Sequence, residues 1–424
     1  RSQQVEARVE QVLQASDLMP AAKGWLVNAL VRHVKKMVTP YRLPQAVSMR
    51  KVLRQGDPAS YRTVPLSLED LAVLQYTGGT TGVAKGAMLS HGNLVANMQQ
   101  VRACLGQLDE QGQPLLREGE EVMIAPLPLY HIYAFTANCM CMLVTGNHNV
   151  LISNPRDIPG FIRELKKWRF SALLGLNTLF VALMDHPEFK DLDFSRLKVT
   201  NSGGTALVKA TAERWQQITG CSVVEGYGLT ETSPVASTNA YGRLARLGSV
   251  GIPVPGTAFK VIDEQGVELP LGEPGELCIQ GPQVMQGYWQ RPEATAEVLD
   301  EQGWLKTGDI AVIDEDGHVR IVDRKKDLVI VSGFNVYPNE VEEVLMAHPQ
   351  VASCAVIGVP DERSGEAVKL FVVPRDASLS VEQLKNYCRE NLTGYKVPKH
   401  IVLRDSLPMT PVGKILRREL RDLA

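Results

Sequence analysis

The segment that most constrains this chain is a glycine- and threonine-rich stretch that lies between an apolar run and a helical pattern. It reads Tyr76-Thr-Gly-Gly-Thr-Thr-Gly-Val-Ala-Lys-Gly-Ala87, follows Leu71–Gln75 and precedes the segment that begins at His91. The apolar run predicts a buried strand, and the segment from His91 predicts the start of a helix. Glycines let a backbone turn tightly and approach a ligand closely. We therefore expect a strand, a loop and a helix, an arrangement in which backbone N–H groups bind phosphate.

The side chains of this loop are also those that a polyphosphate requires, because hydroxyls donate hydrogen bonds and an ammonium group neutralises charge. The candidate ligands are Thr77, Gly78, Gly79, Thr80, Thr81, Gly82 and Lys85. The loop is not a Walker A motif, which ends in Gly-Lys-Ser/Thr, because Lys85 lies between Ala84 and Gly86. Taken alone, the stretch is equally compatible with a flexible turn that binds nothing.

Composition indicates a multidomain protein of the cell interior. The chain has 424 residues, a hydrophobic content of 44% and a net charge of −2. Its length favours two or three domains, and its charge gives no attraction to nucleic acid or anionic lipid. Cys139 and Cys141 have no Cys or His neighbours at metal-binding spacing, so we expect reduced cysteines in the core and a cytoplasmic location. Residue 1 is Arg and no signal peptide follows, so we interpret the chain as a fragment.

Two segments raise the question of a membrane. The uncharged run 122–155 is long enough to span a bilayer, but its prolines, histidines and asparagines favour a buried strand–loop–helix–strand unit. Residues 1–20 predict a polar helix, and 23–38 predict a helix with one apolar and one basic face. We prefer a helix packed on the domain for 23–38, with peripheral contact on the inner face of the membrane as the alternative. Residues 39–70 predict a loop-rich connection.

The pattern of apolar residues changes twice along the chain. From 88 to 235, apolar runs alternate with helical patterns, which predicts a parallel α/β sheet. From 243 to 322, short alternating runs between Gly, Pro and Asp predict a small antiparallel β unit. A compact α+β domain follows the charged segment Asp323–Asp327. The expected strands are 122–125, 150–152, 172–174, 197–200, 351–357 and 369–373, and the expected helices are 161–168, 208–219, 336–347 and 381–390.

Other motifs carry groups suited to a nucleotide. Tyr227 lies between glycines and offers a ring for stacking on a base, and Glu231 is a hard oxygen ligand suited to Mg²⁺; an ordinary strand-to-helix turn is the alternative. Asn201–Thr205 predicts a second glycine turn, and Asp309, at an expected turn, is suited to ribose hydroxyls. The motifs G-x-S-x-G and H-E-x-x-H are missing, which removes support for hydrolase and zinc-protease functions. The residues alone predict an α/β protein with a nucleoside triphosphate site.

Taken in order, these motifs resemble the core motifs of the adenylate-forming superfamily, which includes acyl-CoA synthetases, luciferases and peptide-synthetase adenylation domains. The matching segments are Tyr76–Ala87, Tyr227–Glu231, Thr307–Asp309, Asp323–Asn335 and Gly413-Lys414. The sequences of three further segments are most similar to those of bacterial long-chain-fatty-acid–CoA ligases: Asn154–Gly160, Asn335–Glu340 and Leu392–Lys399. The resemblance covers essentially the whole chain, although family members normally begin with a further N-terminal segment.

The resemblance implies a fold and a reaction. The fold would be a large N-terminal domain of mainly parallel sheet layers, 1–242, a small antiparallel β subdomain, 243–323, and a mobile α+β lid, 324–424. The reaction would convert a fatty acid and ATP, with Mg²⁺, to acyl-AMP and pyrophosphate, and then transfer the acyl group to coenzyme A. Alternatives are a fatty-acyl-AMP ligase that delivers to a carrier protein and a fragment that binds nucleotide without turnover. Chain-length preference and a homodimer stay open.

The resemblance also implies roles for individual residues. The nucleotide would be held by Tyr76, Thr77, Gly78, Gly79, Thr80, Thr81, Gly82, Lys85, Gly203, Gly204, Thr205, Tyr227, Gly228, Asp309 and Arg324. Thr230 would contact the α-phosphate, Glu231 would bind Mg²⁺, and Lys414 would neutralise charge between the carboxylate and the α-phosphate. Tyr130 and Phe135 would border the acyl pocket, Phe135 as its gate, with His131 near the reacting centre. Lys326 would be the hinge that withdraws Lys414 and brings Gly333 and Phe334 to coenzyme A.

Overall fold

The computed structural model describes residues 21–36, 49–77, 84–108, 112–241, 245–410 and 413–423, which fall into two units, 1–65 and 66–424. The first unit contains α2 (Ala21–Ala29), a π-helical turn (Leu30–Val34), α3 (Met49–Gln55) and a 3-10 turn (Pro58–Ser60). The helix expected at 23–38 is thus confirmed as far as Val34, whereas the helix expected at 1–20 lies outside the described residues. The loop-rich interpretation of 39–70 missed α3. Within the described ranges, no helix is both long and apolar enough to cross a membrane.

The second unit begins with a hairpin that corrects two predictions. Its first strand was expected to be buried, but it is only partly covered, and Leu71 and Tyr76 are exposed. β1 (Leu71–Thr77) pairs antiparallel with β2 (Lys85–Ser90), and α4 (His91–Leu105) follows directly. The glycine-rich loop therefore joins two strands, and the expected direct passage from loop to helix is wrong. The physical reason lies in β2, where Ala87 and Leu89 alternate into the core and Ser90 caps α4 by accepting a hydrogen bond from Asn93 N at 3.1 Å. Residues 78–83 lie outside the described part of the chain.

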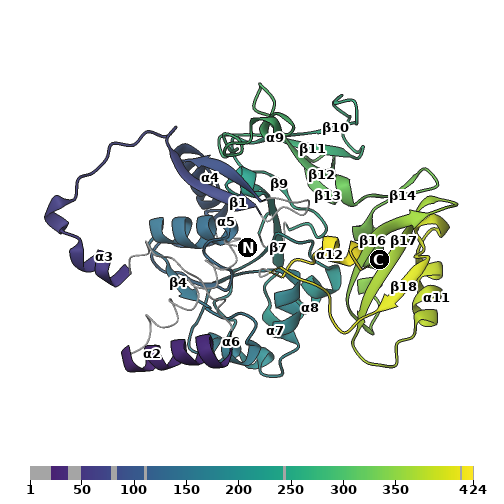
Figure 1. Ribbon diagram of the computed structural model, residues 1–424, viewed down its shortest axis with the longest axis horizontal. Helices are drawn as coiled ribbons and strands as arrows, with labels where there is room; N and C mark the ends of the chain where they lie inside the picture. Colours follow the sequence, from purple (N-terminus) through teal and green to yellow (C-terminus); the bar gives the residue numbers. More distant parts are fainter. Residues whose placement is uncertain are drawn as a thin grey trace. The chain divides into compact units, whose positions relative to one another are not determined.

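A seven-stranded sheet forms the centre of the second unit, in the order β4-β3-β5-β6-β7-β8-β9 (Figure 1). Its strands are β3 (Val122–Ala125), β4 (His148–Leu151), β5 (Ala172–Gly175), β6 (Val199–Gly203), β7 (Val223–Gly228), β8 (Val235–Thr238) and β9 (Ile252–Pro253). Pairing is parallel from β4 to β7 and antiparallel from β7 to β9. The predicted parallel sheet is confirmed, with β6 reaching three residues further than expected, so that Asn201 and Gly203 lie in a strand.

Helices cover both faces of this sheet. They are α5 (Ile132–Ala134), which continues as a π-helix (Phe135–Met142), α6 (Ile158–Leu165), α7 (Asn177–Met184) and α8 (Lys209–Thr219). Leu173 packs into one apolar cluster with side chains of α6, α7 and α8, whereas its neighbours Ala172 and Leu174 pack into a second cluster with α4 and the π-helix. This alternation is what a strand covered on both faces requires. The uncharged run 122–155 is accordingly a buried strand–helix–strand unit, as predicted.

The small antiparallel sheet expected between 243 and 322 is also present. It has the order β10-β11-β12-β13, with β10 (Ala258–Ile262), β11 (Gly275–Gln280), β12 (Leu305–Ile313) and β13 (Val319–Arg324), and with the short helix α9 (Pro292–Ala296) between β11 and β12. Asp309 lies within β12, after Gly308 with its positive φ of 71°, and not at a turn as expected. Cross-strand pairing sets Asp309 opposite Arg324 of β13. The pairing of β12 with β13 therefore places the Asp309 carboxylate and the Arg324 guanidinium side by side.

The C-terminal region is a five-stranded sheet with helices on both faces (Figure 1). It contains β14 (Val329–Val331), β15 (Phe334–Val336), α10 (Pro338–Met346), β16 (Val351–Asp361), β17 (Gly365–Pro374), α11 (Val381–Asn391), β18 (His400–Leu403) and α12 (Arg417–Arg421). Cys354 and Val356 of β16 pack with α10 and α11, whereas Ala355 and Ile357 pack with Leu420 of α12. The predicted helices and strands of this region are confirmed, with β16 and β17 longer than expected.

Candidate active site

A cavity of about 1890 Å³ gathers residues from the β1–β2 hairpin, the central sheet, the small sheet and the C-terminal segment. Of the residues that the sequence singled out, it is lined by Tyr76, Thr77, Lys85, Tyr130, His131, Gly203, Gly204, Thr205, Tyr227, Gly228, Thr230, Glu231, Asp309, Arg324, Lys326 and Lys414. These positions are far apart in the chain, so the fold brings them together. Gly78, Gly79, Thr80, Thr81 and Gly82 lie outside the described residues.

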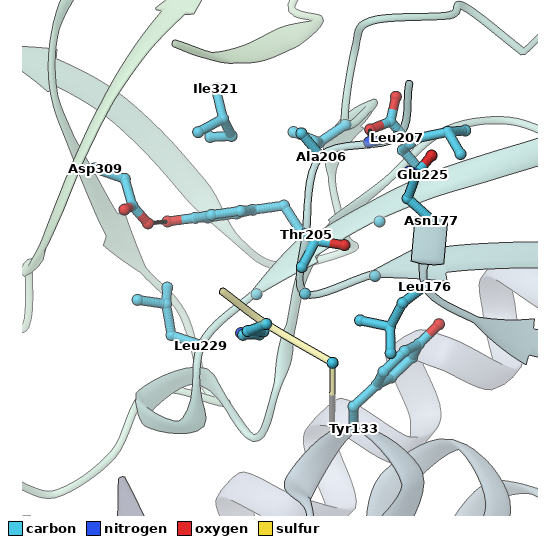
Figure 2. Close-up of a pocket in the computed structure, with 18 of the residues that line it drawn as sticks. Tyr133, Leu176, Asn177, Thr205, Ala206, Leu207, Glu225, Leu229, Asp309 and Ile321 are labelled. Carbon is cyan, nitrogen blue, oxygen red and sulfur yellow. Dashed lines mark hydrogen bonds between the residues drawn. The ribbon is translucent and has the colours of Figure 1, made fainter. Parts of the chain in front are cut away.

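One end of the cavity has a carboxylate held between a phenol and a guanidinium, and Figure 2 shows this carboxylate, Asp309, with its hydrogen bond to the phenol. The Tyr227 hydroxyl donates to Asp309 Oδ2 at 2.6 Å, and Arg324 Nε lies 3.6 Å from Asp309 Oδ1. Burial raises the pKa of the Asp309 carboxyl, and the positive charge of Arg324 acts against that increase. Both partners fix the direction of the carboxylate, which is an acceptor for paired hydroxyl donors such as those of a ribose.

Two glycines at the end of β6, Gly203 within the strand and Gly204 directly after it, make room for side chains from elsewhere. A Cβ on Gly203 would lie 3.0 Å from the Tyr133 ring, and a Cβ on Gly204, where φ is +82°, would lie 3.3 Å from Lys414 Cε. Glycine is required at position 204 for two reasons. L-residues avoid this backbone conformation, and a side chain there would crowd Lys414. Burial, followed by the positive charge of Arg324, lowers the pKa of Lys414 to about 8. The ammonium group is therefore still largely protonated at neutral pH, in a site that favours an anion beside it.

The part of the cavity at the ends of the glycine-rich loop is linked to Glu231 through a tyrosine. Lys85 Nζ lies 4.9 Å from the centre of the Tyr288 ring, and the Tyr288 hydroxyl donates to Glu231 Oε1 at 2.7 Å. Thr77 Oγ1 donates to Lys85 O at 3.4 Å, which ties the two ends of the loop together. Sequence reasoning missed Tyr288, which follows Gly287 and stands outside every motif that we recognised. Its contacts with two candidate residues assign it to the site.

The residue pair Gly228 and Thr230 shapes the turn that carries Glu231. A Cβ on Gly228 would lie 1.9 Å from Pro234 O, so no other residue fits there. Thr230 opens a 3-10 turn, Thr230–Thr232, and Met285 N donates to Glu231 O at 2.8 Å. Backbone contacts therefore hold this turn in place and leave the Glu231 side chain at the cavity.

The Glu231 carboxylate suits a Mg²⁺ ion that is bound together with the phosphates of a nucleotide. Such sites contribute one or two carboxylates, and phosphate oxygens and water complete the octahedron. Glu231 supplies one carboxylate whose Oε1 is oriented by Tyr288. Among the described residues, no group of three or more His, Cys, Asp or Glu could hold a metal by itself. The residues fit an ion that arrives with polyphosphate.

His131 lies at the cavity as a neutral imidazole. Burial, followed by the charge of Lys414, lowers its pKa to about 4. Its Nδ1 accepts a hydrogen bond from Tyr133 N at 3.3 Å and so caps α5, which assigns the proton to Nε2. Its neighbour Tyr130 is exposed and lines the cavity. Phe135 does not line the cavity as the structure describes it, and packs beside the apolar cluster of β2 and the small sheet.

Beyond this polar end, the cavity continues as an arm with an apolar lining, which we call the inner arm. It is lined by Val101, Cys104, Leu105, Met123, Ala137, Leu174 and Val199. All of these except Cys104 belong to the cluster between α4 and the central sheet. Burial raises the pKa of the Cys104 thiol to about 11, so this side chain is neutral as well. An unbranched hydrocarbon is the kind of group that such a lining accommodates.

The hinge candidate Lys326 lies in a 3-10 turn, Lys325–Asp327, between β13 and β14. It lines the cavity, and burial lowers its pKa. The chain after Lys414 is anchored by Arg417, whose Nη2 donates to both Glu342 oxygens at 2.8 Å and whose Nη1 lies 3.6 Å from Asp327 Oδ2. These contacts fasten the segment that carries Lys414 to α10 and to the turn at Lys326.

Gly333 and Phe334 lie apart from the cavity in the described structure. Ser332 and Gly333 have φ of 51° and 83° and form the turn between β14 and β15. Phe334 is exposed and stacks on Tyr395, with ring centres 4.9 Å apart. The two residues are therefore presented on a hairpin of the C-terminal sheet, away from the other candidate residues.

Comparison with known proteins agrees with this geometry. The family described as “AMP-binding enzyme” matches residues 4–289, and the “AMP-binding enzyme C-terminal domain” matches residues 340–414. The chain is 54% identical over 408 residues to a long-chain-fatty-acid–CoA ligase of Escherichia coli O6:H1, which covers 96% of this chain and 71% of that protein.

Solved structures give the same result. ATP-bound MatB from Rhodopseudomonas palustris has a TM-score of 0.79 at 32% identity and covers 95% of this chain and 77% of its own. The anthranilate CoA ligase AuaEII, in complex with anthranoyl-AMP, has a TM-score of 0.80 at 26% identity and covers 93% and 76%. With the motifs, the cavity and these matches in agreement, the chain belongs to the AMP-binding, adenylate-forming family of enzymes.

Proposed function

We propose that this chain activates a long-chain fatty acid with ATP and then passes the acyl group to coenzyme A. The observation that carries the proposal is the single cavity that joins an apolar inner arm to an end with Asp309, Lys414 and Glu231. A fatty acid needs the first environment and a nucleotide needs the second. A relative with 54% identity is named a long-chain-fatty-acid–CoA ligase, and solved relatives hold ATP or an acyl-AMP.

The chemistry explains why both ends meet. A carboxylate is a poor electrophile because its leaving group would be oxide. In the first step a carboxylate oxygen bonds to the α-phosphorus of ATP while the bond from that phosphorus to the bridging oxygen breaks, which releases pyrophosphate. In the second step the coenzyme A sulfur bonds to the acyl carbon, AMP leaves with the electron pair of the acyl–oxygen bond, and the thiol proton passes to solvent. Neither step needs an enzyme nucleophile, so positioning and charge neutralisation carry the catalysis.

Residues at the polar end would bind the nucleotide. Asp309, held by Tyr227 and Arg324, would accept the ribose hydroxyls, and Tyr227 would lie along the adenine together with the Gly203–Thr205 segment. Thr230 would donate to the α-phosphate from the turn that carries Glu231. Lys85 and Thr77, at the ends of the glycine-rich loop, would face the β- and γ-phosphates.

Lys414 and His131 would act at the reacting atoms. Negative charge builds up where the carboxylate approaches the α-phosphate, and the buried ammonium group of Lys414 would neutralise it. His131 is neutral and protonated on Nε2, so it would donate a hydrogen bond there without adding a second cation. The two roles are complementary, because a second positive charge beside Lys414 would lower its pKa further.

Glu231 would hold Mg²⁺ together with phosphate oxygens, and Tyr288 would keep the carboxylate oriented. When bound, the ion would supply charge neutralisation on the pyrophosphate group that leaves. The protein's own part is to fix one oxygen ligand on a turn whose backbone is constrained by Gly228 and Met285.

The C-terminal domain, 324–424, would work as a lid that turns about Lys326. Lys414 belongs to the adenylating arrangement, whereas Gly333 and Phe334 lie on a hairpin away from the cavity. Rotation of the lid would withdraw Lys414 and bring the hairpin to the pantetheine thiol, which is a known gating device.

The test is fatty-acid-dependent exchange between ATP and pyrophosphate, measured with Mg²⁺ over acids of increasing length and followed by addition of coenzyme A. Exchange that peaks with long acids, together with formation of acyl-CoA and AMP, is expected. Acyl-AMP that accumulates with coenzyme A but disappears with an acyl carrier protein would contradict the acceptor. Absence of exchange with ATP still bound would contradict the activity itself.

We also propose peripheral contact with membrane for the helix at 21–34. Trp25, Leu26 and Val34 are exposed, and Arg32, Lys35 and Lys36 lie in the same short segment. Exposed apolar and basic side chains on one helix favour an anionic bilayer surface. Recovery with anionic vesicles in a flotation assay is expected, and loss of that recovery in a Trp25→Ser/Leu26→Ser variant is the check. No recovery of the parent chain would refute this contact.

A further inference from the structure

The inner arm is not uniformly apolar. Tyr133 packs both on the apolar cluster that lines this arm and against Gly203 at the polar end. Its hydroxyl donates to Asn201 Oδ1, and both residues line the cavity. Asn201 lies on β6 two residues before Gly203, and the missing side chain of Gly203 makes room for the Tyr133 ring. Figure 2 shows Tyr133 beside Leu176, against whose cluster it packs. A hydrogen-bonding pair therefore stands at the neck of an apolar arm.

The neck has further polar groups. Tyr241 and Thr238 also line the cavity, and hydrogen bonds with Thr238 and Asn201 oppose the increase that burial causes in the pKa of Tyr241. We name Tyr133, Asn201, Thr238 and Tyr241 the collar. A purely apolar lining would have been the simplest way to bind an alkyl chain, because buried polar groups lower stability unless they are hydrogen-bonded. The hydrogen bond between Tyr133 and Asn201 satisfies this requirement for that pair, and all four residues line the cavity.

The arrangement predicts how the collar treats an acyl chain. Methylene groups that pass it leave the Tyr133–Asn201 hydrogen bond intact, so unsubstituted acids are tolerated. A hydroxyl on the chain can donate to the phenol oxygen, which has a second acceptor site, or accept from the Asn201 amide. Residues of a strand are about 3.3 Å apart along it, so Asn201, three residues before Gly204, lies within about 10 Å of the glycine beside Lys414. The favoured hydroxyl group therefore lies in the half of the fatty acid nearest the carboxylate, and not at the methyl end.

On the basis of the function proposed above, we propose that the collar makes Tyr133 and Asn201 specificity-determining residues that favour fatty acids with a hydroxyl group in the half nearest the carboxylate. The substrate class is thus extended from plain long-chain acids to monohydroxylated ones. One hydrogen bond of this kind changes relative specificity by about threefold to tenfold. A larger factor is not expected, because without the hydroxyl the polar groups still bond to each other.

The experiment uses hexadecanoic acid and a positional series of its monohydroxylated forms, including the 16-hydroxy acid as a control with the same group at the far end. The measured quantity is kcat/KM in pyrophosphate exchange for each hydroxy acid divided by that for the plain acid. For the parent chain this ratio is expected to be highest for a hydroxyl group at one position in the half of the acid nearest the carboxylate. In Tyr133→Phe and in Asn201→Ala the peak should fall about threefold to tenfold, while the ratio for the 16-hydroxy acid stays constant. Tyr387→Phe, a matched substitution on α11 where the ring packs edge-on against His348, should leave every ratio unchanged.

A second measurement separates the two proposals. Dissociation constants of the same acids, from calorimetry, give the same ratio without turnover. If the parent chain shows no exchange but binds hydroxy acids more tightly in a manner that depends on Tyr133, the collar stands and the proposed activity fails. If exchange proceeds and the ratios are equal in the parent and Tyr133→Phe, with both melting at the same temperature, the collar is refuted.

Discussion

Replacement of Lys414 by alanine should separate the two half-reactions. The side chain is partly buried beside Gly204, where two unit charges at about 4 Å attract each other by about 4 kcal/mol at an effective dielectric constant of 20. A hydrogen bond to a charged group contributes about 1.5–3 kcal/mol net, and loss of one preorganised donor at a developing anion typically lowers kcat by about 10²–10³. We therefore expect acyl-AMP formation to fall by about 10²–10³ in Lys414→Ala.

Thioester formation from supplied acyl-AMP and coenzyme A should be nearly unaffected, because the lid carries Lys414 away in the second step of the proposed mechanism. Pyrophosphate exchange measures the first reaction, and acyl-CoA formation from synthetic acyl-AMP measures the second. Lys414→Arg is the charge-preserving control and should retain more of the first activity. An equal loss in both half-reactions would refute the division of labour.

The same residue predicts a pH dependence. The pKa of Lys414 is lowered from its ordinary value of 10.5 to about 8, so the ammonium form predominates below pH 8 and disappears above it. In the free enzyme, kcat/KM for acyl-AMP formation should fall as pH rises through about 8 and should be about tenfold below its plateau at pH 9. Lys414→Arg stays charged and should lack this decrease. A decrease of the same size in the arginine variant would assign the titration to another group.

Three further perturbations have defined outcomes. Tyr288→Phe removes the hydrogen bond to Glu231 and should raise the Mg²⁺ concentration for half-maximal exchange about tenfold; an unchanged Mg²⁺ titration would contradict the orienting role. Arg417→Ala leaves the largely covered Glu342 carboxylate without the guanidinium that bonds both of its oxygens, and urea unfolding should show a loss of about 3–5 kcal/mol, against about 0–1 kcal/mol for Arg389→Ala at an exposed pair. Burial raises the pKa of Glu225 from 4.5 to about 7, so the unfolded state ionises first and the parent loses stability as pH rises from 4.5 to 7. Glu225→Gln should therefore equal the parent near pH 4.5 and exceed it by about 3 kcal/mol above pH 7, and a difference that does not change with pH would exclude this carboxyl as the cause.

The order of strands and helices could be predicted because apolar periodicity is a local property. The parallel sheet, the small antiparallel sheet and α8 and α11 follow from runs that any chain of that pattern would form. β2 was missed because it follows a glycine-rich loop, where Ala87 and Leu89 look like the continuation of that loop until β1 is placed beside them. Pairing partners decide such a strand, and they are not local.

The site divides in the same way. Asp309 and Lys414, which line the cavity, were candidates from the sequence because their neighbours form motifs. Tyr288, Tyr133 and Asn201 became candidates for their present roles only through contacts with residues distant in sequence. Phe135 was expected at the acyl pocket from its position in a motif, yet the π-helix directs it to another cluster and Tyr133, two residues earlier, lies at the cavity. A helix rotates by about 100° per residue, so a small change in helical geometry determines which aromatic ring lines the cavity.

The pairing of Asp309 with Arg324 has a consequence for how such enzymes could be recombined. The two residues are cross-strand partners in one sheet, and Arg324 is the last residue of β13, immediately before the turn that holds Lys326. A hybrid that kept this chain up to Arg324 and took everything later from a relative would retain the pair proposed to bind the ribose. The relative would contribute, as one continuous segment, the residues proposed here for charge neutralisation and for the thiol. Nucleotide recognition and acceptor choice would then be inherited from different parents, with the junction at a single peptide bond.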